Sequence, residues 1–167
     1  MIIDSHCHLN YSPMSENLDE VIKRAKNNGV NYMLTISTEH KSFENVLSII
    51  DNYKEVYGTY GIHPHEAKNH MGIKKDNIIN STKLNKKIIG IGETGLDFHY
   101  NHSEKKDQCE LFEQHIYASQ STGLPLIIHS RNAEKETLEI LEKNLKKKEF
   151  KFLIHCFTGS YEFSKKL

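Results

Sequence analysis

The sequence lacks several features that would assign a protein quickly to a functional class. Basic and acidic residues both number 22 among 167 residues, so the formal net charge is zero. No apolar run approaches the roughly 20 residues that a membrane-spanning helix needs, and the N-terminal MIID is too short and too acidic for a signal peptide. Net charge therefore gives no argument for a nucleic-acid partner, and no association with a membrane is predicted.

Cysteine is scarce as well. Cys7, Cys109 and Cys156 lie far apart in the sequence and form no C-x-x-C pair. This spacing argues against a disulfide framework and against a zinc-finger type of site, and it predicts a reduced, cytoplasmic setting.

Short apolar runs alternate with amphipathic segments along the chain, which predicts an α/β fold with parallel strands. The expected strands are residues 2–8, 30–37, 56–62, 87–93, 124–129 and 150–157. The expected helices between them cover about 18–25, 43–50, 76–87, 103–122 and 133–145. The pattern suits a doubly wound sheet or a (β/α)8 barrel, and the absence of G-x-G-x-x-G after the first strand weighs against the doubly wound sheet. A complete barrel needs about 250 residues and eight strands, however, whereas this chain holds about six.

The first strand carries an unusual pair of histidines. His6 and His8 are two residues apart, so both side chains point to the same face of the strand at its C-terminal end. A single histidine there would most simply be a hydrogen-bonded core residue. Two are harder to satisfy by burial, because each neutral imidazole needs a donor and an acceptor, and a metal ion would satisfy two acceptors at once.

Three further strands also end in residues that bind metals. Glu93 ends the fourth strand, His129 the fifth and His155 the sixth. A carboxylate at the end of an apolar strand is costly unless it is paired or bound to a cation. Five ligands exceed the three protein ligands of a typical catalytic zinc site, which suggests two cations bridged by Glu93. Such a centre suits displacement at phosphorus.

These segments resemble a known family. The blocks SHCHLN, GIHPHEA, GIGETGLDFHY, LPLIIHSRNA and IHCFTGS match, in order, the pattern of TatD-type metal-dependent deoxyribonucleases of the amidohydrolase superfamily. The resemblance implies a (β/α)8 TIM-barrel fold and hydrolysis of DNA, as single strands or at ends. It implies that His6, His8 and Glu93 hold one divalent metal ion and that Glu93, His129 and His155 hold a second. Zn, Mn, Mg and Fe are all compatible with these ligands.

Other residues of the matching blocks are candidates for substrate contact. His63 and His65 flank Pro64, and His63 is the better candidate for holding a phosphate, with a solvated loop as the alternative. Arg131 is one of only two arginines among the 22 basic residues. Its guanidinium suits bidentate binding of phosphate, with a structural salt bridge as the alternative. Asp97 and His99 either line the rim or cap their loop.

The chain also departs from the family pattern. Family members carry a further ligand, an aspartate in an SDxP- or TDxP-like block after a later strand, and this sequence ends before such a block. Residues 1–167 are therefore expected to form a single domain, the N-terminal two thirds of a TatD-like barrel, whose first and last strands are unpaired edges.

Three functional interpretations remain open. The first is a metal-dependent hydrolase, foremost a deoxyribonuclease. The second is a fragment that is inactive or is completed by a second polypeptide. The third is an amidohydrolase or tRNA-ester deacylase of the same superfamily. Many cyclic amidases bridge their metals with a carboxylated lysine, so Glu93 in the bridging position favours the nuclease.

Overall fold

The computed structural model describes residues 1–167, and its centre is one six-stranded sheet. All neighbouring strands are parallel, and their order in the sheet follows the chain. The strands are β1 (Ile2–Cys7), β2 (Val30–Thr35), β3 (Val56–Tyr60), β4 (Ile88–Asp97), β5 (Leu126–Arg131) and β6 (Phe152–Ile154). The predicted alternation of parallel strands and helices is confirmed.

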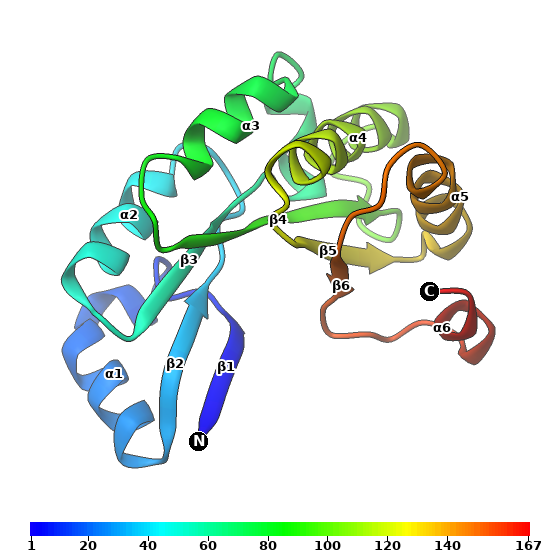
Figure 1. Cartoon of the computed structure of the whole chain (residues 1–167). Helices are drawn as coiled ribbons and strands as arrows, with labels where there is room; N and C mark the ends of the chain where they lie inside the picture. Colours follow the sequence, from blue (N-terminus) through cyan, green and yellow to red (C-terminus); the bar gives the residue numbers. More distant parts are fainter.

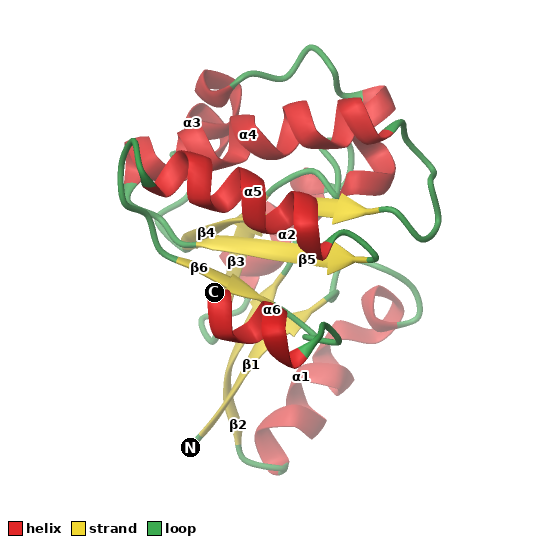
Figure 2. Cartoon of the chain, turned by 90° about the vertical axis from the view of Figure 1, so that its right-hand side faces the viewer, coloured by secondary structure: helices red, strands yellow, loops and turns green.

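Helices cover one side of this sheet. They are α1 (Leu18–Asn27), α2 (Phe43–Asn52), α3 (Lys75–Thr82), α4 (Lys105–Thr122), α5 (Glu134–Leu145) and α6 (Tyr161–Lys166), with short 3-10 helices at Met14–Asn17 and Pro64–Asn69. Figure 1 shows α1 to α5 on the outer, convex side of the curled sheet. The view in Figure 2, turned by 90°, places α5 and α6 in front of β5 and β6. No helix is both long enough and apolar enough to cross a bilayer.

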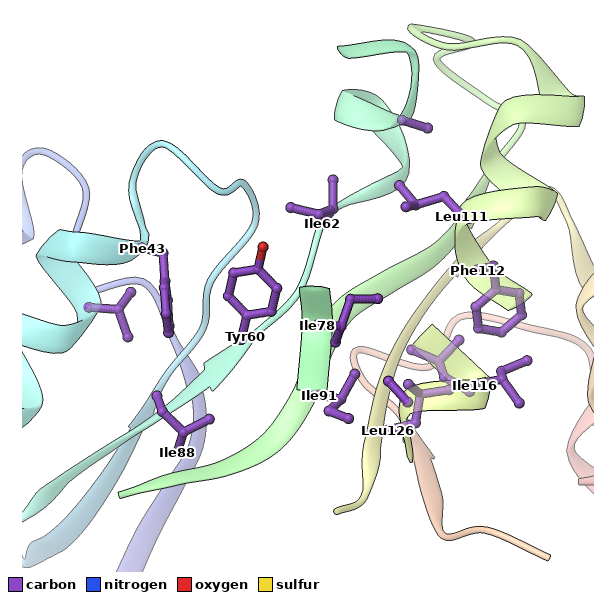
Figure 3. Close-up of a cluster of buried hydrophobic side chains, with 14 of the residues drawn as sticks. Phe43, Tyr60, Ile62, Ile78, Ile88, Ile91, Leu111, Phe112, Ile116 and Leu126 are labelled. Atoms are coloured by element: carbon purple, nitrogen blue, oxygen red, sulfur yellow. The ribbon is translucent and has the colours of Figure 1, made fainter. Parts of the chain in front are cut away.

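The apolar core lies between the sheet and the outer helices. Figure 3 shows part of it, where Tyr60 and Ile91 from the strands meet Phe43, Ile78 and Phe112 from the helices. Burial of such side chains stabilises the fold by roughly 1.5–3 kcal/mol each. The core therefore fixes the strands from outside and leaves their carboxyl ends free to carry polar side chains.

One polar side chain is built into this core. His115 of α4 is fully buried. Its Nδ1 donates to Leu111 O at 2.8 Å, and its Nε2 accepts from Ile62 N at 3.1 Å. Burial lowers the pKa of His115 to about 4, so the ring is neutral at pH 7. The bond to Ile62 holds the start of the loop that carries His63.

Strand β4 is longer than predicted. It continues four residues past Glu93 to Asp97, because Thr94–Asp97 pair in parallel with Ile128–Arg131 of β5. Gly95 permits this continuation: its φ is +130°, and a Cβ there would lie 2.2 Å from His129 O. The extension brings Asp97 into the sheet beside the end of β5.

The two edges of the sheet are β1 and β6. Ile2 and Ile3 on β1 and Leu153 on β6 are exposed, as expected for unpaired edge strands. The sheet nevertheless curls so strongly that its edges approach each other at the carboxyl end. The rings of His6 and His155 stack there, with centroids 3.9 Å apart and planes 8° from parallel.

Candidate metal centre

Glu93 lies at the middle of the polar cluster at the carboxyl ends of the strands. Its carboxylate is 4% exposed, and imidazoles surround it. His155 Nε2 lies 2.5 Å and His129 Nδ1 3.1 Å from Oε1, while His6 Nε2 lies 3.3 Å from Oε2. The five residues predicted as metal ligands are thus brought together around one carboxylate, with His8 Nε2 at 3.9 Å.

The charge of Glu93 depends on these imidazoles. Burial alone would raise the pKa of its carboxyl, but hydrogen bonds from His129 and His155 outweigh burial and hold the pKa well below its usual range. The carboxylate is therefore ionised across the physiological pH range, which is the form that binds a cation.

The hydrogen bonding of His6 and His8 indicates whether the cluster fits a metal ion. Both ring nitrogens of His6 and Nδ1 of His8 are buried without a hydrogen-bond partner. A buried polar atom left unpaired costs roughly 1–3 kcal/mol. Ligand atoms of His6, His8 and Glu93 lie within 4.8 Å of one another, so one cation can use the unpaired lone pairs that the protein leaves there. Burial lowers the pKa of His8, which keeps it in the neutral form that binds metals.

His129 is oriented from both sides. Its Nε2 lies 3.0 Å from Asp97 Oδ2, and its Nδ1 faces Glu93. Without a cation, the two carboxylates raise the pKa of His129 despite its burial. With Nε2–H donated to Asp97, the lone pair of Nδ1 is available to a metal ion. With a cation bound at Nδ1, His129 would complete the carboxylate–histidine–metal arrangement common in metalloproteins.

His63 carries its proton on the same ring nitrogen, Nε2, but turns that nitrogen toward Glu93, whereas His129 turns Nδ1 there. Its Nδ1 accepts a hydrogen bond from the backbone N–H of His65 at 3.2 Å. Since burial lowers the pKa of His63 to about 3, the ring is neutral and its proton is on Nε2, which lies 3.6 Å from Glu93 Oε1. His63, Glu93 and His129 lie close enough to hold a cation. The tautomer nevertheless makes His63 a hydrogen-bond donor toward the centre, as contact with a phosphate requires.

Asp97 caps its loop, one of the two alternatives given by the sequence, and it is fully buried beneath the rim instead of lining it. Its Oδ1 accepts from the backbone N–H groups of His99 and Tyr100 at 3.0 Å, which caps the loop after β4. Its Oδ2 accepts from His129 and also from His65 Nε2 at 2.9 Å. Burial would raise the pKa of Asp97, but these donors lower it to about 2. His99, by contrast, is exposed.

Arg131 lies on the rim, outside the lining of the central cavity. Its guanidinium carbon is 4.7 Å from the centroid of the Tyr100 ring, and Nη1 donates to the Tyr100 hydroxyl at 3.2 Å. No carboxylate forms an ion pair with it, so the structural salt bridge is absent. Four of its N–H groups stay available, and its contact with a phosphate stays a prediction.

An open cavity of about 540 Å³ gives access to the cluster. Its lining includes six of the residues already described: His8, His63, His65, Glu93, His129 and His155. The sequence patterns did not predict that His65 binds Asp97. That hydrogen bond joins a loop residue to a side chain 32 positions away, which no local pattern can indicate.

Comparison with known proteins agrees with this geometry. The model of a family described as TatD related DNase matches residues 3–167. A crystal structure of YjjV, a TatD homologue from Escherichia coli, superposes with a TM-score of 0.83 at 26% identity, over 99% of this chain and 63% of YjjV. The predicted TIM-barrel type of fold is confirmed, with six of its parallel strands present.

Curated relatives are similar along nearly the whole chain. An uncharacterized metal-dependent hydrolase, BU355 of Buchnera aphidicola, is 36% identical over 99% of this chain, which spans 66% of BU355. Deoxyribonuclease Tat-D of Schizosaccharomyces pombe is 32% identical over 88% of this chain, which spans half of that enzyme. Both relatives are single, longer chains, and they give no support to a second polypeptide that completes the barrel. The chain belongs to the TatD related DNase family.

Proposed function

We propose that this chain carries the metal-binding half of the active site of a hydrolase that cleaves phosphodiester bonds in DNA. The observation that supports it best is the set of unpaired ring nitrogens of His6 and His8 facing the ionised Glu93. The name of the S. pombe relative, a deoxyribonuclease, supports DNA as the substrate. Residues 1–167 act in this proposal as one domain.

In this proposal the cluster around Glu93 would hold two divalent cations that share this carboxylate. His6, His8 and Glu93 would hold the first. Glu93, His129 and His155 would hold the second. When bound, such cations lower the pKa of water and neutralise charge on a phosphate. The protein's contribution is to keep His8 neutral, to orient His129 through Asp97 and to keep the carboxylate of Glu93 ionised.

His63 and Arg131 would bind the substrate rather than the metal. The Nε2–H of His63 points to the centre, where a non-bridging phosphate oxygen would accept it. Arg131 has N–H groups to spare at the rim, and they would suit a neighbouring phosphate of the strand. The two residues would thus fix a DNA strand across the cavity.

Hydrolysis of a labelled oligonucleotide tests this proposal. The purified chain with Mn²⁺ or Mg²⁺ should release nucleotides from single-stranded DNA, and a chelator should stop the release. His63→Ala should reduce the rate and leave the metal affinity unchanged, because Nε2 of His63 donates a hydrogen bond toward the centre and offers no lone pair to a metal ion. Cleavage that continues in chelator, or equal loss of metal binding in His63→Ala, would contradict the assignment.

The alternative from the same superfamily is an amidohydrolase or ester deacylase. Glu93 would take the place between two cations that a carboxylated lysine takes in many cyclic amidases, which argues against that class. Turnover of dihydropyrimidine-type amides without turnover of DNA would favour this alternative. Metal binding without turnover of either substrate would favour an inactive fragment.

A further inference from the structure

An exposed group of planar side chains lies beside the metal centre, and two of its members, Tyr100 and His102, take no part in the proposed metal binding. Tyr100 and His102, in the loop after β4, stack with ring centroids 5.7 Å apart and planes 9° from parallel. The guanidinium of Arg131 lies over the Tyr100 ring. We call Tyr100, His102 and Arg131 the rim platform. Tyr100 is 50% exposed although it is among the largest side chains of the loop.

The rim platform is held in place from below. The backbone N–H of Tyr100 donates to the buried Asp97 at 3.0 Å. The ring of His65 meets His102 and Tyr100 edge to face, with centroids 4.6 and 5.5 Å away. Because His65 also donates to Asp97, the planar side chains are oriented before any ligand binds. Preorganised aromatic surface binds at a low entropic cost.

The platform is also adjacent to the metal centre. His65 lies between them, with its ring 4.3 Å from that of His63 and 6.3 Å from that of His129. A nucleotide whose phosphate is at Glu93 would therefore bring its base, or the base of its neighbour, to Tyr100. Aromatic rings and arginine planes are the surfaces on which single-stranded nucleic acids stack their bases.

We infer that the rim platform is a base-stacking subsite for single-stranded DNA, with Tyr100 as its main contact. This inference rests on the proposed function, which it deepens. Stacking on a ring does not distinguish one base from another, so the subsite selects unpaired strands over duplex DNA without reading sequence. Arg131 would contribute both its plane to the stack and its charge to the adjacent phosphate.

Fluorescence gives a direct test, because the chain contains no tryptophan. Tyr100→Trp places a single tryptophan on the platform. Tyr32→Trp is the matched control: Tyr32 is 43% exposed, also meets a second ring, Tyr57, and lies on β2 away from the carboxyl ends of the strands. Phosphorothioate linkages in each probe slow its cleavage while the metal ions stay in place.

Short oligothymidine should quench Tyr100→Trp, whereas an oligonucleotide of equal length with abasic residues should not, and neither should quench Tyr32→Trp. The affinity of labelled oligothymidine, measured by anisotropy, should fall at least about fivefold in Tyr100→Ala. It should stay close to that of the unmodified chain in Tyr100→Phe, which keeps the ring and loses only the hydroxyl bond to Arg131. Circular dichroism melts confirm that each variant folds.

In the fluorescence test, equal quenching by the abasic strand or equal quenching of Tyr32→Trp would overturn the inference. In the anisotropy test, the refuting results are an unchanged affinity of Tyr100→Ala, an equal loss of affinity in Tyr100→Phe, or no binding of oligothymidine at all. The test is separate from hydrolysis. Base-dependent quenching without any cleavage in Mn²⁺ would leave the subsite standing and refute the proposed function. Cleavage without base-dependent quenching would do the reverse.

Discussion

Replacement of Asp97 by asparagine should weaken metal binding although Asp97 touches no metal ion. Both carboxylate oxygens of Asp97 act only as acceptors: Oδ1 accepts from two backbone N–H groups, and Oδ2 accepts from His129 and His65. An asparagine side chain has one acceptor and one donor. If its oxygen keeps the backbone bonds, its NH₂ group faces two imidazole N–H groups at about hydrogen-bond distance.

The conflict is relieved most simply if His129 changes tautomer. Its proton then moves from Nε2 to Nδ1, the atom that faces Glu93, and Nδ1 loses the lone pair that a metal ion needs. Changes to such outer hydrogen-bond partners typically cost 10–100-fold in metal affinity. The fold should also lose roughly 2 kcal/mol, since the native contacts lower the pKa of Asp97 from 3.8 to about 2.

Calorimetric titration with Zn²⁺ or Mn²⁺ measures the affinity, and long-range ¹⁵N–¹H correlation spectra of the imidazoles report the tautomer. Asp51→Asn is the matched control, because Asp51 also accepts a hydrogen bond, from Asn85 at 2.6 Å, but is exposed and outside the site. A folded Asp97→Asn variant whose affinity stays within about threefold of the original would refute the reasoning, because it would show that Asp97 does not set the tautomer.

Three further predictions concern the centre and its support. Glu93→Gln should reduce metal affinity by roughly a hundredfold or more in the same titration, since it removes the shared ligand itself; unchanged binding would place the metal elsewhere. His115 should make stability fall by roughly 3 kcal/mol between pH 6.5 and 4, because the unfolded chain takes up a proton there that the folded core excludes until its pKa of about 4. Urea midpoints should show this slope, and His115→Gln should lose most of it. Gly61→Ala should destabilise by roughly 3 kcal/mol, since a Cβ there would lie 2.3 Å from the backbone of Gly92. Gly72→Ala, with nothing within 4 Å, should leave the melting temperature unchanged.

The parallel sheet and the residues at its carboxyl end could be predicted because both depend on local pattern. The period of apolar residues identifies strands, and a parallel sheet brings all strand ends to one rim whatever the details of packing. His6, His8, Glu93, His129 and His155 therefore converge even though no sequence rule gives their distances.

The orientation of the imidazoles could not be predicted in this way. A tautomer is set by the partner of the second ring nitrogen, and those partners come from other elements: Asp97 for His129, and a loop backbone N–H for His63. The position of Asp97 depends on the extension of β4, and the strand predicted from the sequence ended at Glu93. Gly95 was the available signal, since a glycine past the end of a strand permits the positive φ that the continued pairing needs.

Asp97 connects the two parts of the proposed DNA site. One of its oxygens orients a histidine of the metal centre, and the other fixes the backbone of the loop that presents Tyr100. Since both oxygens are buried and fully used, neither part can shift without disturbing the other's hydrogen bonds. In the proposed site, one side chain would therefore set the distance between a base on Tyr100 and a phosphate at the metal centre. Because the net charge of the chain is zero, long-range attraction would contribute little, and such fixed contacts would have to place the strand.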